Sequence, residues 1–363
     1  MKIGIMSMQR VANYGSFLQA YGLKKVIEEM GNQVVFVDYK PEKPIVPYSR
    51  KEFFREKLKR FYLLEKIYYI YQIRIRKNKS FHYSYTKDYL PLLNVGLKRK
   101  YHTPVDVLLI GSDEVFNCLQ SGVNVGFSRE LFGQNNKAKK VITYAASFGN
   151  TTYDRLIEYH VKSKVEKWIG DLRAISVRDN NSKSIIEKFG RNPLKHVDPV
   201  LISNYDKEIP NIQIKNNYIL VYTYDSRHYS EEEIKIIKKF AKYNKKKIVT
   251  IGKHQWWSDI KIDCDPFTML AYFKDADFVF TDTFHGTVFS IKYNKKFTTL
   301  IRENNKEKLR DLLEIFEMTD REITDLKNLQ KMYETEIDFR SVNEIIKKES
   351  EKAKDYLRKQ LMV

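Results

Sequence analysis

The sequence has 363 residues, of which 42% are hydrophobic and 31% charged, a composition that excludes a disordered chain. It contains no run of roughly 18 apolar residues, and residues 2–6 lack the pattern of a signal peptide, so we expect a cytoplasmic protein. Cys118 and Cys264 are too few for a disulfide framework and lack metal-ligand spacing, so both are expected to be reduced.

The formal charge of +19 is concentrated in one segment. Residues 50–100 contain 15 Lys and Arg against four acidic residues, a net charge of +11, and are rich in Tyr and Phe. Such a surface suits the headgroups of an anionic membrane. Single-stranded nucleic acid and a solvated helical face are the alternatives.

The first forty residues predict a strand–helix–strand unit, with strands at 2–6 and 34–37 and a helix at 17–30. Asp38 follows the second strand as in dinucleotide sites, but G-x-G-x-x-G is absent, so NAD binding is only weakly supported. Three further apolar strands, each followed by polar residues or glycine, are predicted at 105–110, 141–146 and 174–177. The carboxyl ends of such buried parallel strands are where open α/β sheets bind ligands.

A polar stretch at 204–217 predicts a boundary between two lobes. The second lobe has predicted strands at 218–223, 247–251 and 278–281, and a helix at 231–243. We therefore predict an α/β fold with two Rossmann-like, doubly wound domains facing across a cleft, as in glycosyltransferases of the B type (GT-B). The predicted parts are 1–205 with a basic aromatic insertion at about 46–103, 206–335, and a C-terminal helix at 336–363 packing across the domains.

An ordered series of motifs spans nearly the whole chain. These motifs are NYGSFLQA at 13–20, GSDEVFN at 111–117, YAASFG at 144–149, SVRD at 176–179, VDPVL at 197–201 and DFVFTDTFHGT at 277–287. Together they resemble the polysaccharide pyruvyltransferase family. The match thins at 46–103 and beyond 313.

The resemblance implies that phosphoenolpyruvate is the donor and that a cyclic pyruvate ketal forms on two hydroxyls of one sugar, with release of phosphate. It also implies a lipid-linked or nucleotide-linked acceptor for capsule, exopolysaccharide or cell-wall assembly. Residues 50–100 would then contact the inner face of the plasma membrane rather than nucleic acid. We expect no cofactor and no metal, and the sequence leaves the oligomeric state open.

Two cations are candidates for binding the anionic donor. Arg178 follows a buried strand, and the resemblance implies that it contacts the donor; an ion pair with Asp179 or Asp198 is the structural alternative. Lys308 aligns with a family arginine, a replacement that keeps the charge but loses the bidentate fork.

His285 is the candidate general acid or base, since the pKa of histidine lies near working pH. It would protonate the vinyl methylene or accept a hydroxyl proton, while Gly286 permits close approach and Thr283 offers a hydrogen bond. Some family members carry Arg-Leu-His where this chain has Thr283-Phe284-His285. Another cation must therefore substitute, or the donor is held differently.

The first lobe supplies the other candidates. Asp113, in a turn after a strand, is a candidate base for the attacking hydroxyl, with an Asx turn or helix cap as the alternative. Asn13, Gly15 and Gln19 are candidate acceptor contacts, with a plain N-cap as the alternative. Ser147 lacks a G-x-S-x-G elbow and is expected to be a ligand contact or cap, not a nucleophile.

Other functions stay open at this point. A GT-B glycosyltransferase with a nucleotide-sugar donor would share the architecture but would release a nucleotide. A non-catalytic basic protein that binds nucleic acid or membrane would leave the motifs of both lobes unexplained. Trp256 and Trp257, beside His254, would either stack on a sugar or pack in the core.

Overall fold

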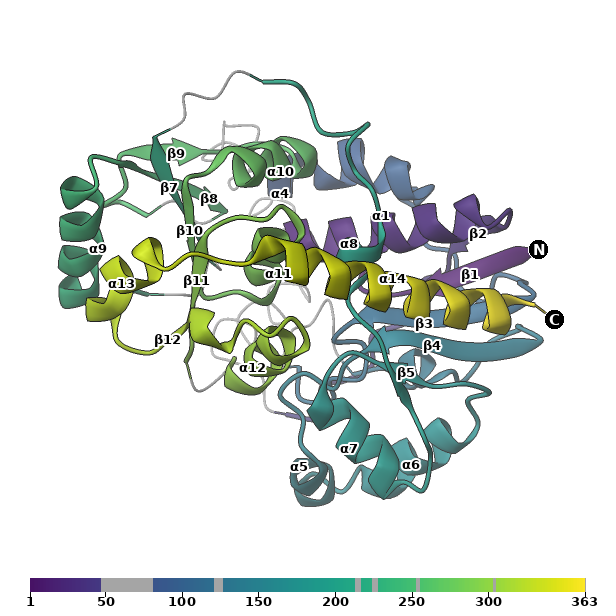
Figure 1. Ribbon diagram of the computed structural model, residues 1–363. Helices are drawn as coiled ribbons and strands as arrows, with labels where there is room; N and C mark the ends of the chain where they lie inside the picture. The colour runs from purple at the N-terminus through teal and green to yellow at the C-terminus, as the bar shows by residue number, and fades with distance from the viewer. Residues whose placement is uncertain are drawn as a thin grey trace, which may run out of the picture. The chain divides into compact units, whose positions relative to one another are not determined.

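The computed structural model describes residues 1–46, 81–120, 127–212, 217–223, 228–252, 255–302 and 305–362 (Figure 1). It divides into two compact units: unit 1 is Met1–Pro199 with Asp355–Val363, and unit 2 is Val200–Lys354. The part of the basic segment before residue 81 lies outside the described residues. Within the described ranges, we find no helix with the length and apolarity needed to cross a membrane.

Unit 1 is built on a six-stranded parallel sheet with the order β2-β1-β3-β4-β5-β6. Its strands are β1 (Lys2–Met6), β2 (Gln33–Phe36), β3 (Val107–Asp113), β4 (Lys140–Ala146), β5 (Ser176–Val177) and β6 (Leu194–Lys195). The chain moves from β1 to β2 in one direction along the sheet and from β3 to β6 in the other. The switch point between β1 and β3 is where an open sheet of this kind opens a crevice for ligands.

Helices cover both faces of this sheet, because right-handed crossovers running in opposite directions lie on opposite faces. Helix α1 (Tyr14–Glu29) connects β1 to β2 and packs on β2 and β3. Leu108 and Ile110 of β3 share a buried cluster with the helices that follow β4 and β5. The remaining helical segments of the unit are α4 (Phe81–Ser84), η1 (Tyr85–Tyr89), η2 (Leu90–Leu93), η3 (Arg129–Phe132), α5 (Tyr153–Glu158), α6 (Lys162–Gly170) and α7 (Asn180–Lys188).

Unit 2 has a second six-stranded parallel sheet, with the order β12-β11-β10-β7-β8-β9. Its strands are β7 (Tyr218–Thr223), β8 (Lys247–Gly252), β9 (Ile260–Ile262), β10 (Phe278–Thr281), β11 (Phe297–Leu300) and β12 (Glu322–Ile323). Numbered within the unit, this is the Rossmann order 3-2-1-4-5-6, and its switch point lies between β7 and β10.

The helices of unit 2 also form two layers. Helix α9 (Glu231–Tyr243) begins at a capping box of Ser230 and Glu233 and buries Ile234, Ile237 and Phe240 in one core cluster. The other helical segments are α8 (Pro199–Ile202), α10 (Pro266–Asp275), α11 (Phe284–Lys292), α12 (Lys306–Ile315), η4 (Thr319–Arg321), η5 (Leu326–Asn328) and α13 (Leu329–Glu334).

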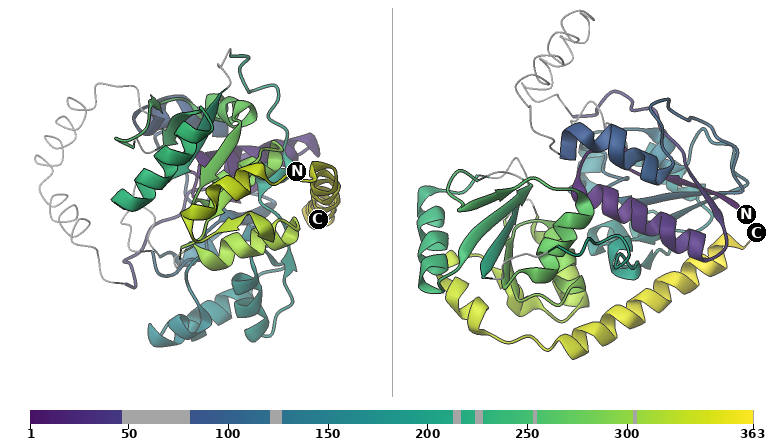
Figure 2. Two further views of the ribbon diagram at one scale, coloured as in Figure 1. Left: turned by 60° about the vertical axis from the view of Figure 1, so that its left-hand side comes forward. Right: turned by 90° about the horizontal axis from the view of Figure 1, so that it is seen from above.

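The last helix, α14 (Phe339–Leu361), is continuous, as Figure 2 shows. Its residues from Asp355 onward belong to unit 1. There the Tyr356 hydroxyl donates to the Thr143 carbonyl at 2.8 Å, and Lys140 Nζ donates to the Gln360 carbonyl at 2.6 Å. These bonds attach the C-terminal turns to β4, and the predicted packing of this helix across the domains stays a prediction.

Candidate active site

Asp113 lies at the switch point of unit 1, at the carboxyl end of β3. Its carboxylate accepts a hydrogen bond from the Ser16 hydroxyl at 2.7 Å and one from the Glu114 amide at 2.9 Å, and the residue is buried. The bond from the Glu114 amide is local, as in the Asx turn that the sequence offered as the alternative role of Asp113. The Ser16 contact joins β3 to α1, and sequence reasoning missed it because the partners are 97 residues apart.

The start of α1 connects the ends of β1 and β3. Asn13 is the N-cap, and its side chain accepts hydrogen bonds from the Gly15 and Ser16 amides. Gln19 is fully buried and donates to the Ser7 hydroxyl at 3.2 Å, which in turn donates to the Ser112 carbonyl at 2.9 Å. Among the described residues, Gln19 Oε1 has no hydrogen-bond partner.

Arg178 follows β5 and is buried. Its Nη1 donates to Asp198 Oδ2 at 3.0 Å, and the side chains of the two residues are 4% and 0% exposed. Burial lowers the pKa of Arg178, but the carboxylates of Asp198, Asp113, Asp179 and Glu114 outweigh burial and raise it above its ordinary value. The ion pair named as the structural alternative is therefore present, and contact with the donor stays a prediction.

Ser147 follows β4 and joins neighbouring segments. Its hydroxyl donates to Asp179 Oδ2 at 2.5 Å and accepts from the Gly149 amide at 2.9 Å. Its backbone amide donates to the Asp113 carbonyl at 3.0 Å. Asp179 is also the N-cap of α7. Ser147 therefore links the ends of β3 and β4 to a helix start, and its expected role as a ligand contact or cap stays a prediction.

In unit 2, the motif containing His285 forms the turn from β10 into α11. Thr283 is the N-cap of α11, and its hydroxyl accepts from the Gly286 amide at 2.9 Å. His285 lies in the first turn, 4% exposed, with its ring in edge contact with that of Phe284. The switch point of this sheet therefore places a buried histidine beside a helix N-terminus.

Gly286 has a packing reason that the sequence did not reveal. A Cβ at this position would collide with Thr281 Oγ1 and would lie 2.7 Å from Thr283 Oγ1. The two threonine hydroxyls are themselves 3.0 Å apart. Glycine is thus required by the tight β10–α11 turn, whether or not a ligand also approaches it.

Arg302 is a cation near this motif that sequence reasoning missed. Its Nη2 donates to Glu233 Oε1 at 3.0 Å, and its Nε lies 3.8 Å from Oδ2 of the fully buried Asp282. Asp282 also accepts from the Thr223 hydroxyl at 2.8 Å, which joins the ends of β7 and β10. An arginine two residues after a buried strand, as here after β11, is the signal that could have identified it. Lys308 lies in the first turn of α12 and is partly buried.

The remaining candidates divide between core and surface. Trp257 is buried and packs in the core of unit 2, whereas Trp256 is 74% exposed. His254 lies outside the described residues. Asp38, which suggested a dinucleotide site, is engaged by Arg10, whose Nη2 donates to Asp38 Oδ2 at 2.8 Å.

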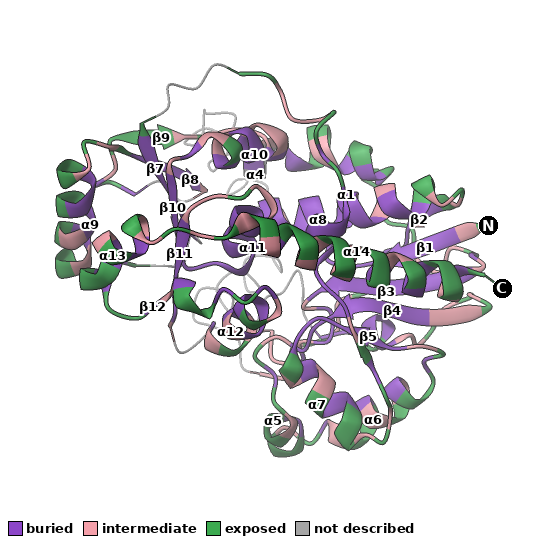
Figure 3. Cartoon of the chain, viewed as in Figure 1, coloured by how far each residue is buried: buried purple, intermediate pink, exposed green. Residues whose placement is uncertain are grey.

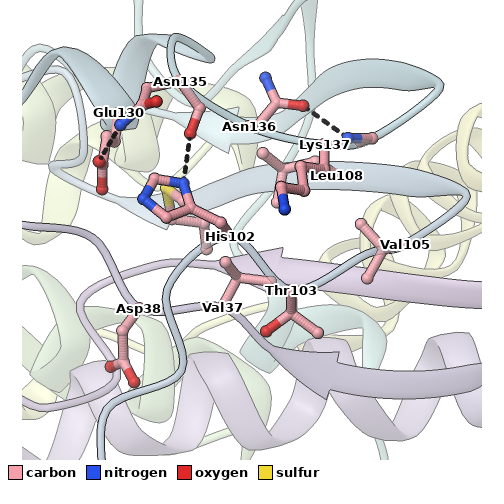
Figure 4. Close-up of a pocket in the computed structure, with 12 residues that line it drawn as sticks. Val37, Asp38, His102, Thr103, Val105, Leu108, Glu130, Asn135, Asn136 and Lys137 are labelled. Atoms are coloured by element: carbon pink, nitrogen blue, oxygen red, sulfur yellow. Dashed lines mark hydrogen bonds between the residues drawn. The ribbon is translucent and has the colours of Figure 1, made fainter.

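A small pocket lies in unit 1. His102 is in its wall and its Nδ1 is 2.8 Å from the Asn135 carbonyl oxygen, as Figure 4 shows. Asp38 and Glu130 also line it. None of the predicted site residues does. In the described ranges, no three His, Cys, Asp or Glu side chains are placed to hold a metal ion.

The two parallel-sheet units define an α/β protein with a GT-B-like fold, which confirms the fold class predicted from the sequence. The complex of S. aureus MnaA with UDP is similar, with a TM-score of 0.52 and 11% identity over 98% of this chain and 96% of that chain. UDP-GlcNAc 2-epimerase from Methanocaldococcus jannaschii gives a TM-score of 0.49 and 11% identity over 96% of this chain and 99% of that chain. At 11% identity the likeness to MnaA shows the fold alone.

The sequence of the chain shows which protein family it belongs to. The family model for polysaccharide pyruvyl transferase matches residues 13–304, and the chain therefore belongs to that family. This confirms the resemblance carried by the motifs, all of which fall inside the matched range. No curated protein matches the chain.

Proposed function

We propose that this transferase moves the enolpyruvyl group of phosphoenolpyruvate onto two hydroxyls of one sugar in a cell-surface polysaccharide precursor. The observation that carries the proposal is the family match over 13–304, which spans both units and includes every motif. Four of the motifs run across the carboxyl end of a strand, namely that of β3, β4, β5 or β10, and doubly wound sheets bind ligands at such ends.

The reaction balances without a redox partner. Protonation of the methylene carbon makes C2 electrophilic, and one sugar hydroxyl attacks it. The bond from C2 to the phosphate oxygen then breaks, phosphate leaves, and the second hydroxyl closes the ketal. Of the two hydroxyl protons, one replaces the proton that formed the methyl group and the other leaves with phosphate.

Within unit 2, His285 is the proposed acid that protonates the methylene carbon. It is buried in the first turn of α11, and a low-dielectric site strengthens the influence of nearby dipoles on a developing charge. The Thr283 hydroxyl is already used to cap α11, so its proposed donor contact would come in addition to that bond. Phe284 and Lys308 complete the proposed donor contacts of this unit.

Within unit 1, Asp113 is the proposed base for the attacking hydroxyl, and Ser16 positions its carboxylate. Gln19 supports a polar ligand here, because its buried Oε1 has no partner among the described residues, and buried acceptors are normally satisfied. Arg178 is the proposed donor contact of unit 1.

The acceptor is proposed to be lipid-linked or nucleotide-linked, and a lipid-linked acceptor would bring the protein to the inner face of the plasma membrane. The basic segment 50–100 is the proposed attachment, since its net charge of +11 would be attracted to anionic lipids. This part of the proposal is independent of which residues act on the donor.

The proposal is tested by supplying the purified chain with phosphoenolpyruvate and a set of lipid-linked and nucleotide-linked glycans. Release of phosphate together with a pyruvyl mass increase on one glycan is expected. Consumption of a nucleotide sugar with release of nucleotide, and no use of phosphoenolpyruvate, would replace this proposal by the glycosyltransferase alternative.

A further inference from the structure

A second basic segment lies in unit 2 and is fully separate from residues 50–100. Between residues 235 and 261 the sequence has nine lysines and one acidic residue, Asp259, which gives a net charge of +8. Together with the +11 of residues 50–100, this equals the +19 of the whole chain. The rest of the chain therefore has no net charge, and the excess positive charge lies in these two segments.

Helix α9 carries four of these nine lysines, and all four are exposed. Ile234, Ile237, Phe240 and Ala241 are buried, whereas the α9 lysines are exposed. Figure 3 shows α9 with both buried and exposed parts. The exposed lysines of this surface are Lys235, Lys238, Lys239, Lys242, Lys245 and Lys247. The exposed acidic residues Glu231 and Glu232 are confined to the first turn, where their negative charges interact favourably with the positive end of the helix dipole.

Two large aromatic side chains belong to the same surface. Tyr243, which ends α9, is 73% exposed, and Trp256 is 74% exposed. The Lys238 ammonium lies 5.8 Å from the ring centre of Trp256, so the loop before β9 is in contact with the lysine face. We call the six exposed lysines with Tyr243 and Trp256 the α9 surface.

We propose that the α9 surface binds the anionic headgroup layer of a membrane. Lysines near such a layer are attracted by its negative potential, while Trp and Tyr favour the boundary between headgroups and acyl chains. Folding leaves both aromatics exposed although Trp257, next in sequence, is buried. A polynucleotide would also attract the lysines, but single-strand sites combine charge with a groove of stacking rings, whereas the exposed lysines here lie on the outer face of one helix and the residues that follow it. The inference does not depend on the transfer reaction.

The test measures partition of the full chain onto vesicles that contain phosphatidylglycerol and onto vesicles of phosphatidylcholine alone. The variant Lys238→Glu/Lys239→Glu/Lys242→Glu should bind the anionic vesicles about a hundredfold more weakly, at about 1 kcal/mol per lysine. The matched control is Lys347→Glu/Lys348→Glu/Lys352→Glu, which makes the same charge change on exposed positions of α14. The control should bind nearly as well as the unchanged protein.

Equal partition of the two triple variants, or no binding of the unchanged protein to anionic vesicles, would overturn the proposal. The proposal would also be overturned if the unchanged protein binds single-stranded DNA but not the vesicles, and the α9 variant loses the binding of DNA. A second readout separates insertion from bulk attraction: brominated anionic lipid should quench the tryptophan emission, and Trp256→Ala should remove most of that quenching. Unchanged emission in vesicle-bound protein would also contradict the proposal.

Discussion

Arg178 and Asp198 form a buried ion pair that bears on both stability and donor binding. Replacing Arg178 with Met would remove the positive charge that pairs with the buried Asp198 carboxylate, and breaking a buried ion pair in this way typically costs about 3–5 kcal/mol. We therefore expect Arg178→Met to lower the free energy of unfolding by that amount, as measured by urea denaturation.

The double variant Arg178→Met/Asp198→Asn separates folding from function. It removes both charges, so much of the lost stability should return. If Arg178 contacts the donor, this folded double variant should still fail to bind phosphoenolpyruvate. Wild-type affinity in the double variant would limit Arg178 to a structural role.

His285 gives the second prediction at the residue scale. General acid–base catalysis typically contributes about 10²–10⁴-fold, so His285→Gln should lower kcat by that factor without lowering Tm. His160→Gln is the matched control, because His160 is exposed in a loop after α5. Phosphate release measures the rate, and a His285→Gln rate within about twofold of wild type would remove His285 from the proton-transfer step.

Residue roles could be predicted only where they depend on local sequence. The N-cap at Asn13 was predictable as an alternative because it uses the next three residues of the chain. The pairing of Arg178 with Asp198 was predictable as an alternative because the two residues lie in consecutive motifs, 20 positions apart. The Ser16–Asp113 bond and the position of Arg302 could not be predicted, because they depend on which strands become neighbours in the sheet.

The β10–α11 turn is the element whose packing can be tested most directly. Gly286→Ala would place a methyl group against the Thr281 and Thr283 hydroxyls, and overpacking of this kind typically costs about 1–3 kcal/mol. Gly170→Ala is the matched control, since a Cβ there meets nothing within 4 Å in α6. That change should stabilise by about 0.4–1 kcal/mol, because alanine lowers the conformational entropy of the unfolded chain.

Unfolding in urea measures both glycine variants. Gly286→Ala at wild-type stability would show that the turn can shift, which would leave ligand approach as the better reason for a glycine.

Elements with clear apolar runs were predicted closely. The predicted strands at 218–223 and 278–281 and the helix at 231–243 coincide with β7, β10 and α9. Strand β11 was missed because Thr298 and Thr299 interrupt its apolar pattern. Both are fully buried, and their hydroxyls bond to the Arg321 carbonyl and to Thr287. Long-range bonds of this kind make a polar strand suitable for the core, and no local pattern indicates them.

At the scale of the whole molecule, alternation of strands and helices was enough to predict two doubly wound sheets. It was not enough to predict their strand orders, because both orders depend on the direction of each crossover. The order differs between the sheets: β2-β1-β3 at the switch point of unit 1, and β10-β7-β8 at that of unit 2. Each order decides which loops come together, and hence which candidate residues are neighbours.

The central claim is that this family member uses phosphoenolpyruvate, and it can be tested before the acceptor is known. Calorimetric titration of phosphoenolpyruvate into the folded chain, alone and with the glycan set, should give saturable binding at millimolar or lower concentration. The Arg178→Met/Asp198→Asn variant should give none. Absence of binding to the unchanged, folded protein under both conditions, while a nucleotide sugar binds, would contradict the account.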